Sequence, residues 1–100
     1  MIIQIVRYRS GLDEDEVQEH FEERADGYRQ VDGLLQKYYV RYPETGEVGG
    51  VYVWDSEESL ERWRAGNLAG TLAATYEVEG EPEAELAEVT LVLRPGELEA

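Results

Sequence analysis

Residues 36–54 read QKYYVRYPETGEVGGVYVW, and this stretch decides the fold. Apolar and aromatic side chains occupy both parities of residues 34–42 and 48–54, which predicts two strands covered on both faces. Pro43-Glu-Thr-Gly46 between them fits a tight turn, because proline presets the first corner and glycine tolerates the positive φ that closes a hairpin. Gly49-Gly50 indicates a bulge, or a place where another group approaches the backbone closely.

The segment before this hairpin predicts a strand followed by a helix. Residues 2–8 are β-branched and apolar on both parities, as expected of a strand covered on both faces. Ser10 or Asp13 can cap the helix that follows, and the acidic residues at 13–16 suit a helix N-terminus. One apolar stripe recurs at helical spacing: Val17, Phe21, Ala25 and Tyr28.

The segment after the hairpin predicts a broken helix and a last strand. Asp55 or Ser56 begins the helix, and the glycines at 66 and 70 interrupt it, so a second short helical piece is expected. Residues 77–85, which are rich in glutamate, are expected to form a loop. The apolar residues 86–93 predict the final strand.

The predicted order is βαββαβ in a single domain, residues 1–100. Two βαβ halves with right-handed crossovers give an α+β, ferredoxin-like fold: a four-stranded antiparallel sheet with helices on one face. The other sheet face is apolar too, and a bare apolar face of that size favours a partner. The simplest partner is a second copy, which predicts a homodimer through the sheet face.

The composition argues against several classes of partner. The chain has 100 residues, 23 acids and 9 bases, and a net charge of −14. Such a surface repels nucleic acids and anionic membranes. Eight of the nine bases are arginine, a balance that suits a halophilic protein in concentrated salt, although an ordinary acidic protein has the same signature. Neither a signal peptide nor an apolar span is present, so a cytoplasmic location is expected.

The chain resembles the YdhR-type putative monooxygenases of the dimeric α+β barrel superfamily, which also holds the antibiotic-biosynthesis monooxygenases. The resemblance rests on Gly33-Leu-Leu-Gln-Lys-Tyr-Tyr-Val, Glu44-Thr-Gly46 and Gly49-Gly-Val-Tyr-Val-Trp54. It implies a homodimeric barrel that oxygenates a small aromatic or polyketide-like substrate without a cofactor. Haem-degrading members carry an Asn, a Trp and a His, whose order and spacing this chain does not reproduce.

Two residues are candidates for catalysis. His20 is the single histidine, at the edge of the apolar helix stripe, and can take a proton from a phenol-like substrate near neutral pH. Its alternative role is that of a half-exposed helix residue. Lys37 is the single lysine, on a strand that otherwise looks buried. It either pairs with a carboxylate across the sheet or holds an anionic substrate, an enolate or superoxide.

Further side chains are candidates for substrate binding, with structural alternatives for each. Aromatic rings can stack a flat substrate or simply fill the core and interface. Asn67 can offer its amide to a substrate or cap a helix, and Arg7 poses the same question as Lys37. The candidate binding residues are Arg7, Tyr39, Tyr52, Trp54, Trp63 and Asn67.

Other site chemistries are not expected. The chain has no cysteine, which excludes disulfides and thiolate metal sites, and its acidic runs fit solvated faces better than metal cages. An RNA-binding ferredoxin-like domain is disfavoured by the charge. The main rival to an enzyme is a non-enzymatic, small-molecule-binding or stress-type dimeric barrel, whose aromatic residues only build core and interface.

Overall fold

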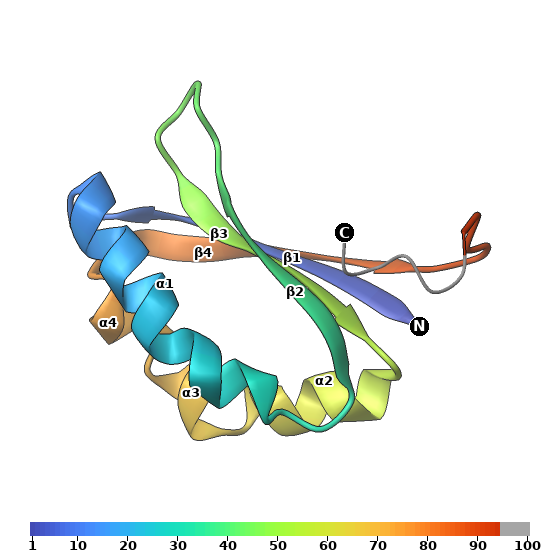
Figure 1. The fold of residues 1–100 in the computed structure, drawn as a ribbon. Helices are drawn as coiled ribbons and strands as arrows, with labels where there is room; N and C mark the ends of the chain where they lie inside the picture. Colours follow the sequence, from blue (N-terminus) through green and yellow to red (C-terminus); the bar gives the residue numbers. More distant parts are fainter. Residues whose placement is uncertain (95–100) are drawn as a thin grey trace.

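The computed structural model describes residues 1–94, which form one antiparallel sheet with helices on a single face (Figure 1). The elements are β1 (Ile2–Ser10), α1 (Glu14–Arg29), β2 (Leu34–Arg41), β3 (Val48–Trp54), α2 (Glu57–Arg64), α3 (Asn67–Gly70), α4 (Leu72–Thr75) and β4 (Val78–Glu88). The strands lie in the order β2-β3-β1-β4. This is the predicted ferredoxin-like arrangement, and the prediction is confirmed.

Local signals in the sequence account for the helix starts. Asp13 caps α1 and forms a capping box with Glu16, whose side chain accepts from the Asp13 backbone N–H in return. Ser56, rather than Asp55, is the N-cap of α2 and accepts from the Ser59 N–H. The second helical segment breaks after Arg64, where the Gly66 N–H donates to the Trp63 carbonyl, as expected.

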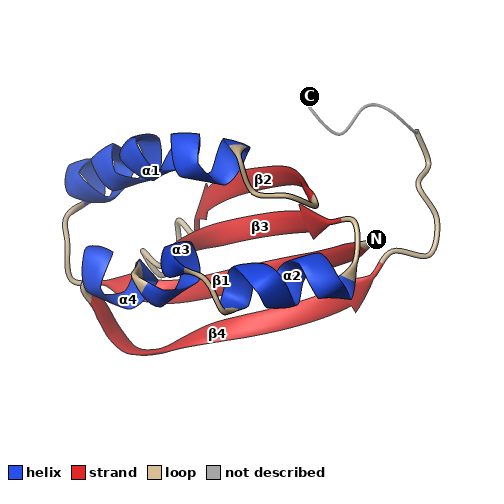
Figure 2. Cartoon of the chain, turned by 90° about the horizontal axis from the view of Figure 1, so that it is seen from below, coloured by secondary structure: helices blue, strands red, loops and turns tan. Residues whose placement is uncertain are grey.

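The sheet has one face toward the helices and one face without any helix among the described residues (Figure 2). Strand pairing places Lys37 opposite Tyr52, and Tyr39 opposite Gly50, on the helix side. Tyr52 pairs in turn with the buried Gln4 of β1. Tyr38, Ile5 and Val51 therefore point to the opposite face. Residues 37, 39, 52 and 54 thus share the helix side, a choice that the sequence leaves open.

The paired glycines of β3 permit two close approaches. A Cβ at Gly49 would lie 1.8 Å from the Val6 carbonyl oxygen, so only glycine allows β1 and β3 to pair at this position. A Cβ at Gly50 would lie 3.1 Å from Lys37 Cε and 3.1 Å from the Tyr52 ring. Gly50 thereby makes room for the lysine side chain across the strand.

The last strand differs from its predicted position. The sequence predicts a loop over residues 77–85 and a strand over 86–93, but β4 runs from Val78 to Glu88. The segment alternates glutamate with small or apolar residues, and its pairing with β1 places Glu83 opposite Arg7 and Glu79 opposite Arg9. Opposite charges across strands stabilise an edge that glutamate, glycine and proline disfavour by propensity. Pro82 is tolerated because β4 is an edge strand.

The core lies between the sheet and the helices and is unusually aromatic. Trp54 and Leu60 are fully buried and Tyr52 nearly so, and the Trp54 indole N–H donates to Gln4 Oε1 at 3.0 Å. Within residues 1–94, no helix has the length and apolar character needed to cross a lipid bilayer.

Candidate functional site: a caged lysine

Lys37 lies under α1 in a cage of three tyrosine rings. Its Nζ is 3.3 Å from the ring centroid of Tyr28, 4.2 Å from that of Tyr39 and 4.5 Å from that of Tyr52. The rings come from α1, β2 and β3, so the cage exists only in the folded chain. Ammonium groups bind the negative faces of such rings.

The charge of Lys37 is not balanced by an acid. No carboxylate within residues 1–94 forms an ion pair with its amine, so the expected pairing across the sheet is replaced by the ring contacts. Burial, with a smaller contribution from the positive charge of Arg24, lowers the pKa of Lys37 to about 6. The amine is therefore mostly neutral at pH 7, and it can accept a proton.

The rings and the burial act on this amine in opposite directions. Contact with ring faces favours the ammonium by about 0.5–2 kcal/mol. Full burial of a lysine can lower its pKa by roughly 3–5 units, and each unit corresponds to about 1.4 kcal/mol. Burial therefore decides the direction of the shift, and the cage holds a lysine that readily loses its proton.

Two hydroxyls of the cage add to its polarity. The Tyr28 and Tyr39 hydroxyl oxygens are buried and have no hydrogen-bond partner at normal geometry in the described part of the chain. An unsatisfied buried polar group costs about 1–3 kcal/mol, so such groups mark places that suit a polar guest. Burial raises the pKa of Tyr39 to about 12, which keeps its hydroxyl protonated and able to donate. Burial, and to a smaller degree the neighbouring Tyr28, also raises the pKa of Tyr52.

The space around the cage is divided into an interior void and two open grooves. The void, about 10 Å³, touches Lys37 and all three rings, and it is large enough only for a water molecule or a single oxygen atom. A groove of about 320 Å³ between α1 and β2 also has Lys37 in its wall, beside Tyr28, Tyr39 and Arg29. Lys37 therefore lines both the void and an open surface groove.

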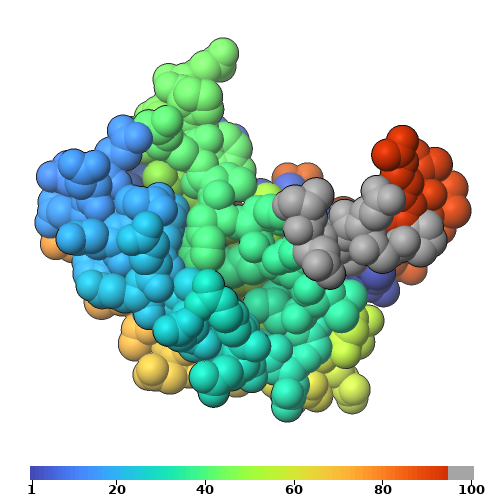
Figure 3. Space-filling model, viewed as in Figure 1, coloured from blue at the N-terminus to red at the C-terminus, as the bar shows by residue number. Residues whose placement is uncertain are grey.

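A second groove, of about 470 Å³, lies nearer the hairpin. Its walls include Val17 and Phe21 from α1 and Tyr39 from β2, and an ion pair between Arg41 and Glu14 connects the same two elements. Figure 3 shows the surfaces of α1 and β2 side by side, with the hairpin tip projecting beyond them. Tyr39 lines the void and both grooves, so its ring separates interior from exterior.

Of the predicted binding residues, Tyr39 and Tyr52 meet at Lys37, whereas both tryptophans lie deeper in the core. Tyr52 stacks on Trp54 with ring centroids 6.0 Å apart and contacts Trp63 at 5.0 Å. Neither tryptophan lines the void or the two grooves beside Lys37. Both tryptophans pack against Tyr52 and so help to hold this ring beside the Lys37 amine.

His20 and Asn67 lie away from the cage. The His20 side chain is 35% exposed, its Nδ1 is 3.4 Å from a Glu23 carboxylate oxygen, and its ring meets Tyr76 edge-on at 5.9 Å. It reaches the site only through Tyr76, which lines the void. Asn67 begins α3 and borders a separate surface hollow beside Asp32 and Arg62.

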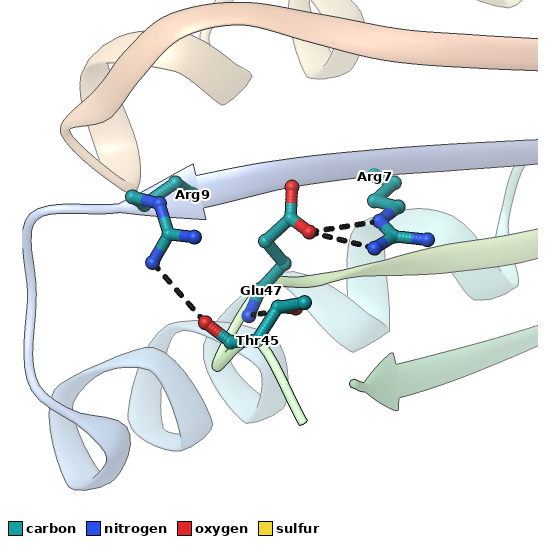
Figure 4. A network of polar contacts seen from close by, with 4 residues as sticks. All are labelled: Arg7, Arg9, Thr45 and Glu47. Atoms are coloured by element: carbon teal, nitrogen blue, oxygen red, sulfur yellow. Dashed lines mark hydrogen bonds and ion pairs between the residues drawn. The ribbon is translucent and has the colours of Figure 1, made fainter. Parts of the chain in front are cut away.

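Arg7 lies on the sheet face opposite Lys37. It donates to Glu47 through both Nε and Nη2, at 3.0 and 2.7 Å (Figure 4). Its guanidinium also stacks over the Tyr42 ring at 4.1 Å. This contact lowers the pKa of Glu47 and raises that of Arg7, mainly through their hydrogen bonds. Arg9 donates to the Thr45 carbonyl nearby. The arrangement anchors the hairpin to β1.

Sequence reasoning misses three contributors from the helical layer. It places Tyr28 only in the α1 stripe, yet Tyr28 makes the shortest contact to the amine. Arg24 donates to the Leu68 carbonyl and Thr71 Oγ1, joining α1 to α3 and α4 while its charge acts on Lys37. Tyr76 closes the void. For Arg24 and Tyr28 the available signal is helical spacing, because with Phe21 they lie on one side of α1.

The described residues offer no cluster of three or more His, Cys, Asp or Glu side chains around a common point. The chemistry of the site is therefore that of an amine, tyrosine hydroxyls and flat apolar rings. Such a set can accept a proton, donate hydrogen bonds to a developing oxyanion and stack a planar ligand.

A comparison with protein-family models finds one match, described as "Putative mono-oxygenase ydhR", over residues 2–79. The chain belongs to this family. No curated protein sequence matches it. The family match covers β1 to the start of β4, and so includes the hairpin and every residue of the Lys37 cage.

Solved structures with the same fold include oxygenases. A putative antibiotic biosynthesis monooxygenase from Deinococcus radiodurans has a TM-score of 0.73 and 17% identity, over 94% of this chain and 97% of that one. SnoaB, a cofactor-independent oxygenase from Streptomyces nogalater, has a TM-score of 0.73 and 15% identity, over 92% and 95%. MhuD, solved with two manganese protoporphyrin IX molecules per active site, has 0.73 and 19%, over 94% and 99%. At these identities the likeness shows the fold.

Proposed function

We propose that this protein is a cofactor-independent monooxygenase of a small aromatic or polyketide-like substrate, with Lys37 as its base. The observation that carries the proposal is the buried amine, enclosed by three rings and unpaired with any acid in residues 1–94. Membership of the mono-oxygenase family supports the reaction class. SnoaB, which has the same fold, supports chemistry without a cofactor.

In the proposed reaction the substrate supplies the electrons. Neutral Lys37 takes a proton from an acidic C–H or O–H of the substrate, and the resulting carbanion or phenolate passes one electron to O2. The two radicals combine to a carbon-bound peroxide anion, which takes the proton back from the Lys37 ammonium to become a hydroperoxide and then loses water. One activated methylene group and one molecule of O2 thus give one carbonyl group and one molecule of water. The ammonium left on Lys37 and the Tyr39 hydroxyl are placed to stabilise negative charge on oxygen.

The direct test is oxygen uptake with a panel of hydroquinones and anthrones. Lys37→Met removes the base while keeping an apolar side chain of similar length, and we expect uptake to fall about 100-fold or more, the size of a lost general base. His20→Ala is the matched control, because His20 lies outside the cage, and it should keep most of the activity. Equal uptake by wild type and Lys37→Met would contradict the role of Lys37.

A second candidate function, non-enzymatic binding of a small molecule, is favoured by one observation. The void beside Lys37 is about 10 Å³, far smaller than a substrate, so a flat ligand would have to displace the Tyr39 ring or remain in the grooves. Ligand binding by calorimetry together with an absence of oxygen uptake across the panel would favour this alternative.

We also propose that the protein is a homodimer through the helix-free sheet face. That face carries Ile3, Ile5 and Val51, together with Tyr38, which is 40% exposed. Arg7, Glu83 and Glu85 make the β4 side of this face polar, so the apolar part lies over β1, β3 and β2. An apolar area without a covering layer is costly for a monomer. Light scattering should give twice the 11.4 kDa of the chain, and Ile5→Glu should shift the mass toward the monomer. A wild-type mass of one chain at micromolar concentration would contradict the dimer.

A further inference from the structure

The Lys37 amine is placed for a second kind of chemistry, as a nucleophile. An amine attacks carbonyl carbon only when it is neutral and within reach of the carbonyl compound. Lys37 contributes to the wall of the groove of about 320 Å³ between α1 and β2. Its Nζ lies against the rings of Tyr28 and Tyr39, which line the same groove, so a small molecule in the groove meets Nζ once one of these rings turns aside. The titratable and charged groups that line the void or the groove with it are Tyr8, Tyr28, Tyr39, Tyr52, Tyr76 and Arg29, and the charge of Arg24 also acts on it.

These neighbours favour a carbonyl partner over a structural role for the amine. A nearby cation and an apolar enclosure are the two conditions that keep a lysine neutral and nucleophilic in water. The Tyr39 hydroxyl, which is buried and has no hydrogen-bond partner in the described part of the chain, can donate to an oxygen of the ligand. The rings of the cage present flat faces to a planar product.

We propose that Lys37 forms a covalent imine with a small 1,3-dicarbonyl compound held between α1 and β2. The nitrogen lone pair adds to one carbonyl carbon, a proton passes from nitrogen to the new hydroxyl, and one water leaves. The carbon–oxygen double bond is thereby replaced by a carbon–nitrogen double bond, with no change of oxidation state. A proton then moves from the central carbon to nitrogen, and the product is a planar, conjugated enaminone. Its remaining carbonyl oxygen can accept a hydrogen bond from Tyr39.

Imine formation uses the same residue as the proposed oxygenase reaction but does not require oxygen. The test is therefore run without air, with pentane-2,4-dione as the probe. The enaminone is followed by its near-ultraviolet absorbance and by a mass increase equal to the diketone less one water. Because Lys37 is the single lysine, the chain has only one other amine, the α-amino group of Met1. Peptide mapping separates the two, so Met1 is a reference inside the same sample.

We expect Lys37 to react faster than Met1 in the folded protein and to lose that advantage in urea. Between pH 7 and 9 the rate at Lys37 should stay nearly constant, whereas an ordinary lysine gains about 100-fold in neutral amine over that range. Lys37→Arg, which places a permanent cation at this position, and Lys37→Met should both abolish the adduct at position 37 while Met1 still reacts.

Reaction at Lys37 that is no faster in the folded than in the unfolded chain, or that rises 100-fold from pH 7 to 9, would overturn the proposal. Both measurements come from the wild-type protein, so they hold even if a variant does not fold. If the imine fails while oxygen uptake still requires Lys37, the base role stands and the nucleophile role falls. If no oxygen uptake is found and the imine forms, the nucleophile role stands and the base role falls.

Discussion

At the scale of the residue, Lys37 shows how much of the site can be predicted from the sequence. Its rarity and its place on a strand that reads as buried single it out, and Tyr39 and Tyr52 are named with it as candidates. In the structure β2 is an edge strand without a fully buried residue. The third ring, Tyr28, is assigned from sequence only to the core. β1, β2 and β3 have apolar residues on both parities, so the sequence leaves undetermined which side of the sheet meets α1. The pairing of Lys37 with Tyr52, and not Tyr38 with Tyr52, depends on register set by the whole sheet.

The depressed pKa of Lys37 has a consequence for stability. In the unfolded chain its pKa returns to about 10.4, so between about pH 6 and 10 the unfolded state binds one more proton than the folded state. Stability therefore rises with pH across this window, by up to about 1.4 kcal/mol per pH unit. Lys37→Met should lose that slope while keeping the contributions of all other groups. Urea unfolding at several pH values measures both proteins, and parallel pH profiles would contradict the buried neutral amine.

At the scale of the element, the hairpin and the helix starts can be predicted, but β4 cannot be placed. The hairpin contains the proline and the glycine that its turn requires, and Asp13 and Ser56 are themselves the caps of the helices that follow them. The bounds of β4 depend instead on pairing with β1, whose register runs from Ile2 opposite Glu88 to Ser10 opposite Val78. Local propensity favours the apolar residues after position 86, and tertiary pairing overrides it.

The two glycines of β3 offer a matched pair of substitutions. Gly49→Ala would place a methyl group 1.8 Å from the Val6 carbonyl oxygen, so β1 and β3 must separate, and we expect a loss of about 3–4 kcal/mol or failure to fold. Gly50→Ala meets the end of the Lys37 stem at 3.1 Å. It should cost about 1–2 kcal/mol, since a flexible side chain can shift, and it should disturb oxygen uptake more than stability. Thermal unfolding of both variants distinguishes them, and equal costs would contradict this division of roles.

At the scale of the whole molecule, a net charge of −14 acts on a chain of 100 residues. Part of this negative charge lies on β4. Glu85 and Glu88 pair with Ile5 and Ile2, so no arginine stands opposite them to offset the repulsion between carboxylates. Salt screens repulsion between exposed charges beyond about 10 Å at 0.1 M and about 3 Å at 1 M. We expect the melting temperature to rise steadily with potassium chloride up to molar concentrations. An unchanged melting temperature would contradict a protein adapted to salt.

Titration of the single lysine measures directly whether the Lys37 amine is neutral in the folded protein at pH 7. Lysine labelled with carbon-13 at Cε gives one resonance in this protein, because Lys37 is the only residue that carries the label. Its chemical shift, followed from pH 4 to 11, reports the protonation of the amine without any substrate. We expect a midpoint near pH 6, as the burial of the amine and the absence of an acid partner within residues 1–94 require. A midpoint near the ordinary value of about 10.4 would contradict both the base and the nucleophile assigned to this site.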